Sequence, residues 1–324
     1  MAYQKLVSII IPYHSEDVYR LNVVLSSINN QIGVDFEQIE VILVGDAPVE
    51  AVRLSDFVLL QHLDLQMHVI TGDSVGAGLA RQAGMDLARG QYLMFMDADD
   101  QFQFVGSLLE FFNVAKMGNH DMIIARYLEE SYYNGAYRYY TSSARDWKAA
   151  YGKWFSVDYL ARIGLKWHPN LRIYEDTYFV GIAATLSPDT HYIDSVVYTR
   201  MYNATSTVRK DDYWFERQHH TWADENRYWL QFMRFHRPER MLSDLNYYLV
   251  DVYFRRQVNA SEDDALFWEA HKRLVLENRD IWAGYTPELA TYAESLQDRE
   301  DKYKAFSLDG LSDFIASSEQ FLRD

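Results

Sequence analysis

The sequence predicts an α/β fold in which a mostly parallel β-sheet is flanked by helices and followed by a helical C-terminal region. Three observations predict it. Apolar runs typical of buried strands alternate with segments of helical spacing over the first hundred residues. Beyond about residue 210, helical spacing dominates. The chain has 324 residues, of which 48% are hydrophobic, so it can bury the core that such a fold needs.

The first strand and the first helix follow from residue spacing. Residues 6–11 (LVSIII) form an apolar, β-branched run that stops at Pro12, which predicts a buried strand that leads into a loop. The next apolar residues recur at helical spacing and predict an amphipathic helix: Leu21, Val24, Leu25 and Ile28.

Three more strands continue the alternation. Their apolar runs predict buried strands at 40–46 (EVILVGD), 67–71 (MHVIT) and 91–96 (QYLMFM). Residues 78–90 (GLARQAGMDLARG) have helical spacing, and Gly90 is expected to close that helix. Strands that alternate with helices in this way predict a parallel sheet.

The C-terminal region differs in composition from the rest. It contains few prolines and several stretches with apolar residues at helical spacing, such as MLSDLNYYLVDVYF (241–254). We therefore expect two domains, with residues 1–210 forming the α/β domain and residues 211–324 forming a helical region.

Composition excludes several classes of protein. The chain has no cysteine, so disulfides and thiolate metal sites are excluded and any metal must be held by oxygen or imidazole. The net charge of −16 argues against nucleic-acid binding, which depends on neutralising phosphates. The apolar run before Pro12 is too short for a signal peptide or a membrane span. We expect a soluble, cytoplasmic protein with no transmembrane segment.

Two of the predicted strands end in carboxylates. Asp46 ends the strand at 40–46, and Asp97, Asp99 and Asp100 follow the strand at 91–96. Ligands of open α/β sheets bind at the carboxyl ends of the strands. Alternate carboxylates such as Asp97 and Asp99 suit a hard cation, Mg²⁺ or Mn²⁺, that shares its remaining positions with phosphate oxygens. The alternative is that these acids cap a helix at about 103–115.

Several blocks in a fixed order resemble the glycosyltransferases of family 2, which have a Rossmann-like GT-A fold. The resemblance covers about residues 5–207. The blocks are VSIIIPYH (7–14), EVILVGD (40–46), VGAGLARQAG (75–84), GQYLMFMDADD (90–100), YGKWFSVDYLARIGLKW (151–167) and LRIYEDTYF (171–179). The first four of these blocks, occurring in the right order, are far more specific than any one of them.

The resemblance implies a donor site for a nucleoside-diphosphate sugar. It implies that Asp46 accepts a hydrogen bond from the nucleobase and that Arg81 contacts the nucleotide. Asp99 would bind the metal ion, Mn²⁺ or Mg²⁺, that bridges the diphosphate, and Asp97 would face the ribose or the metal. The full set of donor-binding residues that it implies is Pro12, Tyr13, Asp46, Asp73, Arg81, Asp97, Ala98 and Arg200. The alternatives are a turn role for Asp46 beside Pro48 and a surface ion pair for Arg81.

The resemblance also implies the catalytic residues. Asp176 would be the general base that takes the proton of the acceptor hydroxyl, and Glu175 would orient it or bind the acceptor. An inverting transferase of this kind needs one base and no nucleophile. The alternative is that Glu175 and Asp176 are ordinary acids at the N-terminus of a helix.

Two positions depart from the family pattern. Gly45 stands where the family has the first acid of a pair, although the second acid is present as Asp46. Gln82 stands where the family has an asparagine after the helix arginine. Neither position is where the metal ligand or the catalytic base is expected. The departures therefore bear mainly on which nucleobase of the donor is preferred.

The segment 127–148 (YLEESYYNGAYRYYTSSARDWK) predicts a β-hairpin with its turn at Asn134-Gly135. Its tyrosines could line a groove for a sugar acceptor or could only form cross-strand pairs. Basic residues outnumber acidic ones over 126–172, which indicates a phosphate-bearing acceptor, clamps for the diphosphate or a solvated face.

The expected function is therefore that of an inverting, metal-dependent glycosyltransferase. The expected donor is UDP-linked, and the expected acceptor is a hydroxyl of a glycan or cell-surface glycopolymer. Two alternatives are a glycosyltransferase that acts on a modified nucleobase in DNA and a catalytically silent module that binds a nucleotide sugar or a glycan. The helical region could pack on the first domain, hold a long acceptor or form a homo-oligomer, and the sequence does not choose among these.

Overall fold

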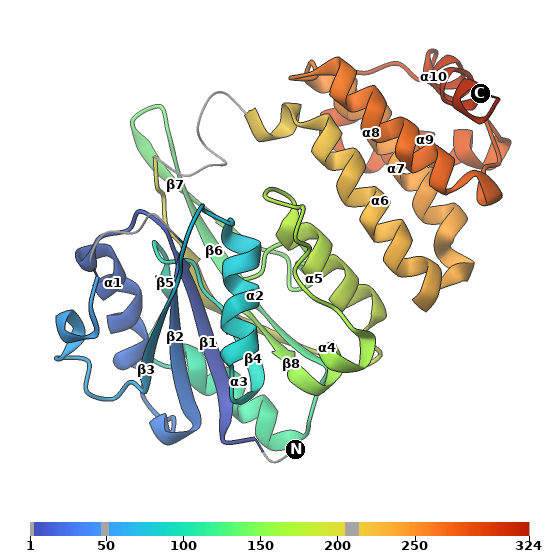
Figure 1. The fold of residues 1–324 in the computed structure, drawn as a ribbon. Helices are drawn as coiled ribbons and strands as arrows, with labels where there is room; N and C mark the ends of the chain where they lie inside the picture. Colours follow the sequence, from blue (N-terminus) through green and yellow to red (C-terminus); the bar gives the residue numbers. More distant parts are fainter. Residues whose placement is uncertain (1–2, 47–51, 205–213, 324) are drawn as a thin grey trace. The chain divides into compact units, whose positions relative to one another are not determined.

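The computed structural model describes residues 3–46, 52–204 and 214–323. The chain divides into two compact units, Met1–Asn203 and Ala204–Asp324. The boundary that the sequence predicts, at residue 210, lies outside the described residues. Figure 1 shows the order of the elements in each unit.

The first unit is built on one mixed sheet. Within the described residues its strand order is β3-β2-β1-β4-β8-β6-β9-β5, and β7 pairs with β6. The strands β3, β2, β1 and β4 are parallel, whereas β8 runs antiparallel to both β4 and β6. The strands are β1 Lys5–Tyr13, β2 Ile39–Asp46, β3 Leu65–Ile70, β4 Gly90–Phe95, β5 Gln101–Phe102, β6 Met122–Tyr133, β7 Ala136–Thr141, β8 Lys153–Ser156 and β9 Thr190–Arg200.

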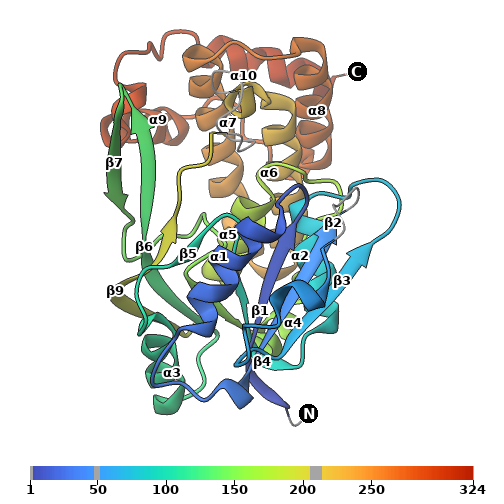
Figure 2. The same cartoon turned by 90° about the vertical axis from the view of Figure 1, so that its left-hand side faces the viewer.

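Helices cover both faces of this sheet, with α1 and α2 on opposite sides (Figure 2). Ile9 and Ile11 of β1 pack in one cluster with residues of α1 and α3. Ile10 points the other way, because side chains alternate along a strand, and contacts Gly84 of α2. The helices of this unit are α1 Val18–Asn29, α2 Ala77–Leu87, α3 Ser107–Met117, α4 Val157–Ile163 and α5 Glu175–Leu186.

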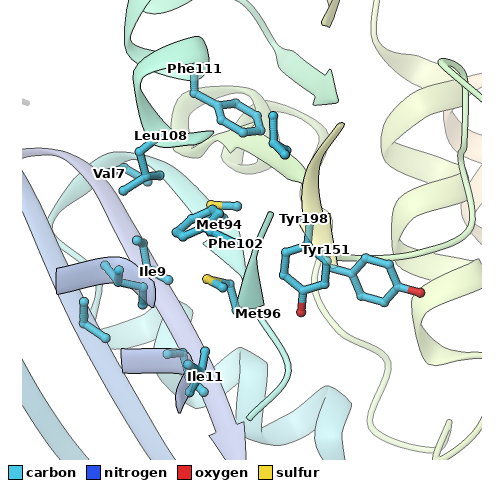
Figure 3. Packing of buried hydrophobic residues seen from close by; sticks show 14 of the residues in the cluster. Val7, Ile9, Ile11, Met94, Met96, Phe102, Leu108, Phe111, Tyr151 and Tyr198 are labelled. Atoms are coloured by element: carbon cyan, nitrogen blue, oxygen red, sulfur yellow. The ribbon is translucent and has the colours of Figure 1, made fainter. Parts of the chain in front are cut away.

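The core beside β1 and β4 extends to the end of β9. Figure 3 shows Met94 near Leu108 and Phe111 of α3, and Met96 between Ile11 of β1 and the rings of Tyr151 and Tyr198. The rings of Tyr151 and Tyr198 stack with their centroids 4.8 Å apart. This stack fixes Tyr198, whose hydroxyl lies at the carboxylates that follow β4.

Most elements that the sequence predicts are present, and three details differ. Gly90 does not close a helix, since α2 ends at Leu87 and Gly90 begins β4. A Cβ there would lie 2.5 Å from the backbone nitrogen of Ser8, so the close approach of β1 requires glycine. The predicted buried strand at 67–71 is a partly exposed edge strand, β3. The helix expected at about 103–115 is displaced to Ser107–Met117.

The predicted hairpin turn is confirmed. Asn134 has φ +50° and Gly135 has φ +80°, the pair of positive values that a type I′ turn requires. The turn joins β6 to β7, and the register pairs Tyr132 with Tyr137 across the two strands.

The second unit is helical, as the sequence predicts. Its described helices are α6 His219–His236, α7 Met241–Val258, α8 Asp264–Glu277, α9 Pro287–Arg299 and α10 Leu311–Glu319. A buried histidine links three of them, because His271 of α8 is hydrogen-bonded at 2.8 Å to both Tyr248 of α7 and Ser318 of α10. Across the described residues of the chain, no helix combines the length and the apolar character needed to cross a bilayer.

Candidate active site

The Asp-Ala-Asp-Asp motif follows the carboxyl end of β4 and is fixed by Asp100. The buried carboxylate of Asp100 accepts hydrogen bonds from the Tyr198 hydroxyl at 2.7 Å and from the backbone N–H of Met201 at 2.8 Å. The Tyr198 hydroxyl also accepts from the backbone N–H of Asp97. The alternative that these acids cap the following helix is wrong, because the N-cap of α3 is Gly106 and no side chain caps it.

Asp97 and Asp99 concentrate negative charge at this position. Burial and the charge of Asp97 raise the pKa of Asp99, although a hydrogen bond of 2.7 Å from the Asn203 side chain opposes the increase. Among the described residues, the carboxylate of Asp97 accepts a side-chain hydrogen bond through Oδ1 alone, from Arg81. A divalent cation would relieve the repulsion between the two acids, so this donor set fits Mg²⁺ or Mn²⁺.

A cation held by Asp97 and Asp99 would need further ligands beyond the described residues of the chain. In the part of the chain that the structure describes, no group of three histidine, aspartate or glutamate side chains could hold a metal ion. That is the usual situation for Mg²⁺ sites, which combine one or two carboxylates with substrate phosphates.

Arg81 joins the motif after β4 to the Glu-Asp motif. Its guanidinium donates to Asp97 Oδ1 at 2.8 Å through Nη2 and to Glu175 Oε1 at 3.1 Å through Nη1. The group also lies 5.0 Å from the ring centroid of Trp167. Arg81 is only 6% exposed, so the interpretation of a surface ion pair is wrong. One buried cation therefore links acids that lie 78 positions apart in the sequence, at residues 97 and 175.

Glu175 and Asp176 are the first two residues of α5. Burial and the charge of Asp176 raise the pKa of Glu175 to about 7, while Arg81 pulls it down. Burial also raises the pKa of Asp176, again against the effect of Arg81. The preceding residue, Tyr174, has φ +63°, a strained value for a bulky residue that sets the direction in which the helix begins. The prediction that Glu175 and Asp176 lie at the N-terminus of a helix is thus confirmed. This position is compatible with a role of Asp176 as the catalytic base.

Asp46 holds the loop that leads into α2. Its carboxylate accepts hydrogen bonds from the Ser74 hydroxyl at 2.7 Å and from the backbone N–H groups of Val75 and Gly76 at 2.8 and 2.9 Å. Arg172 donates to the backbone carbonyl of Ser74 at 2.7 Å. The alternative turn beside Pro48 lies outside the described residues. Contact between Asp46 and a nucleobase stays a prediction.

The other predicted donor residues are spread along the same edge of the sheet. Pro12 is half-buried in β1, and Asp73 is exposed in the loop before α2. The side chain of Ala98 is buried in the core cluster. Arg200 ends β9 and forms an ion pair of 2.7 Å with Glu129 of β6.

The departure at Gly45 has a steric reason. A Cβ at residue 45 would lie 2.9 Å from both Cζ and Oη of Tyr13, the neighbouring residue on β1. Tyr13 is only 3% exposed, so its ring has little room to move. Its hydroxyl is buried and has no hydrogen-bond partner among the described residues. The ring of Tyr13 therefore occupies the space that an acid at position 45 would need.

Substitutions at residues 45 and 13 should have non-additive effects on the free energy of unfolding, because the two residues compete for the same space. We expect Gly45→Ala to lower the free energy of unfolding by about 1–3 kcal/mol, the usual cost of overpacking. In a Tyr13→Ala background the same change should cost much less, because the ring is gone. Urea unfolding of the four proteins measures this cycle, with Gly118→Ala as control, since a Cβ at residue 118 meets nothing within 4 Å. Equal costs in both backgrounds would contradict the steric explanation.

Three residues of the site were not singled out from the sequence. Tyr198 anchors the acids after β4, Asn203 bonds Asp99, and Trp167 lies against Arg81. Tyr198 and Asn203 lie in the segment YTRMYNATST, and Trp167 ends one of the matched blocks, but residue type alone gave no role. Lys153 is completely buried and forms an ion pair of 3.0 Å with Asp146. The spacing of apolar residues in the sequence does not predict such a buried ion pair.

Comparison with known proteins agrees with this geometry. The model of the family described as Glycosyl transferase family 2 matches residues 8–186, more than half of the chain. A poly(ribitol-phosphate) beta-glucosyltransferase from Bacillus spizizenii is 32% identical over 127 residues, which are 37% of this chain and 19% of that protein. Polypeptide N-acetylgalactosaminyltransferase 8 from Drosophila melanogaster is 34% identical over 93 residues, 28% of this chain and 16% of that protein. The chain thus matches less than a fifth of the length of either relative.

Solved structures share the fold at low sequence identity. S. aureus TarS 1-349 in complex with UDP-GlcNAc is similar with a TM-score of 0.67 and 14% identity, over 96% of this chain and 92% of that one. The mannosyltransferase PcManGT from Pyrobaculum calidifontis, in complex with GDP-Man and Mn2+, is similar with a TM-score of 0.51 and 14% identity, over 99% and 89%. These likenesses confirm the expected GT-A fold. The family match over residues 8–186 shows that the chain belongs to glycosyltransferase family 2.

Proposed function

We propose that the chain is an inverting, metal-dependent enzyme that transfers a sugar from a UDP-linked donor to a hydroxyl of a glycan or cell-surface glycopolymer. The observation that carries the proposal is the bridge through Arg81. The bridge holds Asp97 at the end of β4 beside Glu175 at the start of α5. Acids for a donor diphosphate and acids for an acceptor proton are therefore linked by one buried cation.

The donor half of the proposal rests on Asp97 and Asp99. These carboxylates would hold Mn²⁺ or Mg²⁺, which when bound offsets the negative charge that develops on the leaving nucleoside diphosphate. Asp100 keeps the motif in place through Tyr198. The structures of TarS with UDP-GlcNAc and of PcManGT with GDP-Man and Mn2+ support a nucleotide-sugar donor and a metal in this fold.

The acceptor half of the proposal rests on Asp176. In this proposal it takes the proton of the acceptor hydroxyl as that oxygen attacks the anomeric carbon and the diphosphate leaves. Glu175 is held by Arg81 and serves to position the pair. The relative named poly(ribitol-phosphate) beta-glucosyltransferase supports a glycopolymer acceptor. A cytoplasmic location and self-association through the helical unit stay predictions.

The pH dependence of kcat/KM should change when the positive charge of Arg81 is removed. A base must be ionised to act, and Arg81 lowers the pKa of Glu175 and of Asp176. Arg81→Gln should therefore move the acid limb of the kcat/KM profile to higher pH, with the largest loss of activity at acidic pH. Arg81→Lys keeps the charge and should move the limb less.

Arg162→Gln is the control for these profiles, because Arg162 is an exposed arginine that forms an ion pair with Asp121. Its profile should coincide with that of the wild type. If Arg81→Gln lowered activity equally at every pH, Arg81 would not set the ionisation of the base.

The reaction itself can be tested by product analysis. Wild-type protein is incubated with Mn²⁺, UDP-sugars and a panel of neutral glycans and polyol-phosphate polymers, and the release of UDP is measured. The anomeric configuration of the product is then read by NMR. Inversion is expected. A product with the configuration of the donor would rule out the single-base mechanism.

A further inference from the structure

The hairpin of β6 and β7 carries five exposed tyrosines. The exposed fractions are 45% for Tyr132, 58% for Tyr133, 56% for Tyr137, 61% for Tyr139 and 62% for Tyr140. Large aromatic residues are usually buried, and a group of them on the surface commonly marks a binding site. The hairpin therefore needs an explanation beyond its own stability.

The register divides these tyrosines between two faces. Tyr132 pairs with Tyr137, and Glu130 pairs with Tyr139. Residues opposite one another, and residues two apart on one strand, share a face. Tyr132, Tyr137 and Tyr139 therefore lie together with Glu130. Tyr133 and Tyr140 lie on the other face.

Tyr202 extends the first face toward the donor site. Its ring centroid lies 5.7 Å from that of Tyr132 and 6.3 Å from that of Tyr137, whose rings are 5.0 Å apart. The next residue, Asn203, donates to Asp99 at 2.7 Å. We call Tyr132, Tyr137 and Tyr202 the tyrosine cluster. Its residue Tyr202 precedes Asn203, whose side chain contacts Asp99, the acid proposed to bind the metal.

Cross-strand pairing explains only part of this arrangement. A pair such as Tyr132 and Tyr137 contributes about as much as other aromatic pairs across strands. Pairing for stability alone would be expected to bury the rings, yet both remain about half exposed. Tyr139, on the same face, pairs with Glu130 and not with another ring. The rings of Tyr132, Tyr137 and Tyr202 are tilted against one another by 43° to 80° and thus present an amphipathic surface that is stiffened by their mutual contacts.

The chemistry of this face suits a neutral sugar. The hairpin residues that share it are Leu128, Glu130, Tyr132, Tyr137, Tyr139 and Thr141, and none of them is basic. Sugar rings offer apolar C–H surfaces to aromatic rings and hydroxyls to the phenol and carboxylate groups at their edges. Arg138, the basic residue between positions 128 and 141, lies on the other face with its guanidinium 4.9 Å from the ring centroid of Tyr133. Arg126, earlier on β6, donates from Nε to the backbone carbonyl of Ser142 at 3.1 Å. Between residues 128 and 141, an anionic polyol phosphate would find no counter-charge on the tyrosine face.

We propose that the tyrosine cluster is an acceptor subsite that binds neutral sugar rings of the acceptor glycan, away from the hydroxyl that receives the new sugar. This proposal rests on the proposed function and names its acceptor class. Stacking at the cluster holds the glycan while its terminal hydroxyl reaches the base.

Binding can be tested without turnover by saturation-transfer difference NMR. The probes are neutral hexasaccharides of glucose and of N-acetylglucosamine, their monosaccharides, and a polyol-phosphate polymer. We compare the wild type with Tyr132→Ala/Tyr137→Ala, Tyr132→Phe and Tyr19→Ala. Tyr19 is the matched control, because it is 78% exposed on α1. Melting temperature with and without UDP and Mn²⁺ is recorded for each variant.

The proposal predicts saturation of ring protons of at least one hexasaccharide by the wild type, Tyr19→Ala and Tyr132→Phe. The double alanine variant should lose about tenfold in affinity, the order expected for removing stacked rings. Its metal-dependent stabilisation by UDP should remain. Saturation of no neutral oligosaccharide, saturation of the polyol phosphate alone, or equal saturation by the double variant overturns the proposal. Loss of UDP binding in that variant also overturns it, since the cluster would then support the donor site.

Discussion

Asp176→Asn is expected to lose about 10²–10⁴ of turnover, the usual contribution of a positioned general base. The amide keeps the size of the side chain, and it can still accept the hydrogen bond of 2.8 Å that the Thr177 N–H donates to Asp176 Oδ1. It cannot take a proton at neutral pH. Donor binding should be unchanged, because the proposed metal ligands are untouched. Initial rates and donor titrations of the same preparation separate the two effects.

Asp158→Asn is the matched control for this change. Asp158 also lies in the first turn of a helix, α4, but it is exposed. Its replacement should leave the rate within a factor of two or so, as surface changes usually do. If Asp176→Asn kept the wild-type rate, Asp176 would have no part in the mechanism, whatever its position beside Arg81.

Asp99→Ala is expected to abolish metal-dependent donor binding. The change removes a carboxylate whose pKa is raised by burial and by the charge of Asp97, so a bound cation would stabilise its ionised form. Asn203→Ala leaves Asp99 in place but removes its hydrogen bond, so it should weaken metal binding by about 10–100-fold, as loss of an outer partner does. Titration calorimetry with UDP, with Mn²⁺ or with chelator, measures both.

Asp86→Ala provides the control for charge. Asp86 is an exposed aspartate of α2 whose partner is Gln82. It should bind UDP and Mn²⁺ as the wild type does. Unchanged UDP affinity of Asp99→Ala in the presence of Mn²⁺ would contradict the assignment of the metal site to this motif.

The fold could be predicted because the determining signals are local. The buried residues of α1 are the four that the spacing indicates, Leu21, Val24, Leu25 and Ile28. Asn134-Gly135 fixes the hairpin turn, because both positions need positive φ. The edge position of β3 and the role of Gly90 could not be read in the same way. Both depend on which strands become neighbours, and the order of strands is not encoded in the residues of one strand.

The same distinction between local signals and contacts of distant residues applies to the site. The two acidic motifs can be recognised in the sequence as blocks, but the bridge between them cannot. Arg81 is buried between residues 97 and 175, and only the folded chain brings these positions together. Gly45 was recognised as a departure, yet its cause is the ring of Tyr13 on the adjacent strand. Tyr198 and Asn203 were missed because their contacts with the acids after β4 span about a hundred residues.

The central claim, a metal-dependent site for a nucleotide sugar at Asp97 and Asp99, is tested most directly by the melting temperature of the wild-type chain. UDP-, GDP-, CMP- and TDP-sugars are each added with Mn²⁺ and with chelator. A ligand that binds only the native state adds about 2.7 kcal/mol of stability at a hundred times its Kd. We predict an increase in melting temperature with UDP-sugar and Mn²⁺ that chelator removes. No increase with any of the four donors would contradict the claim.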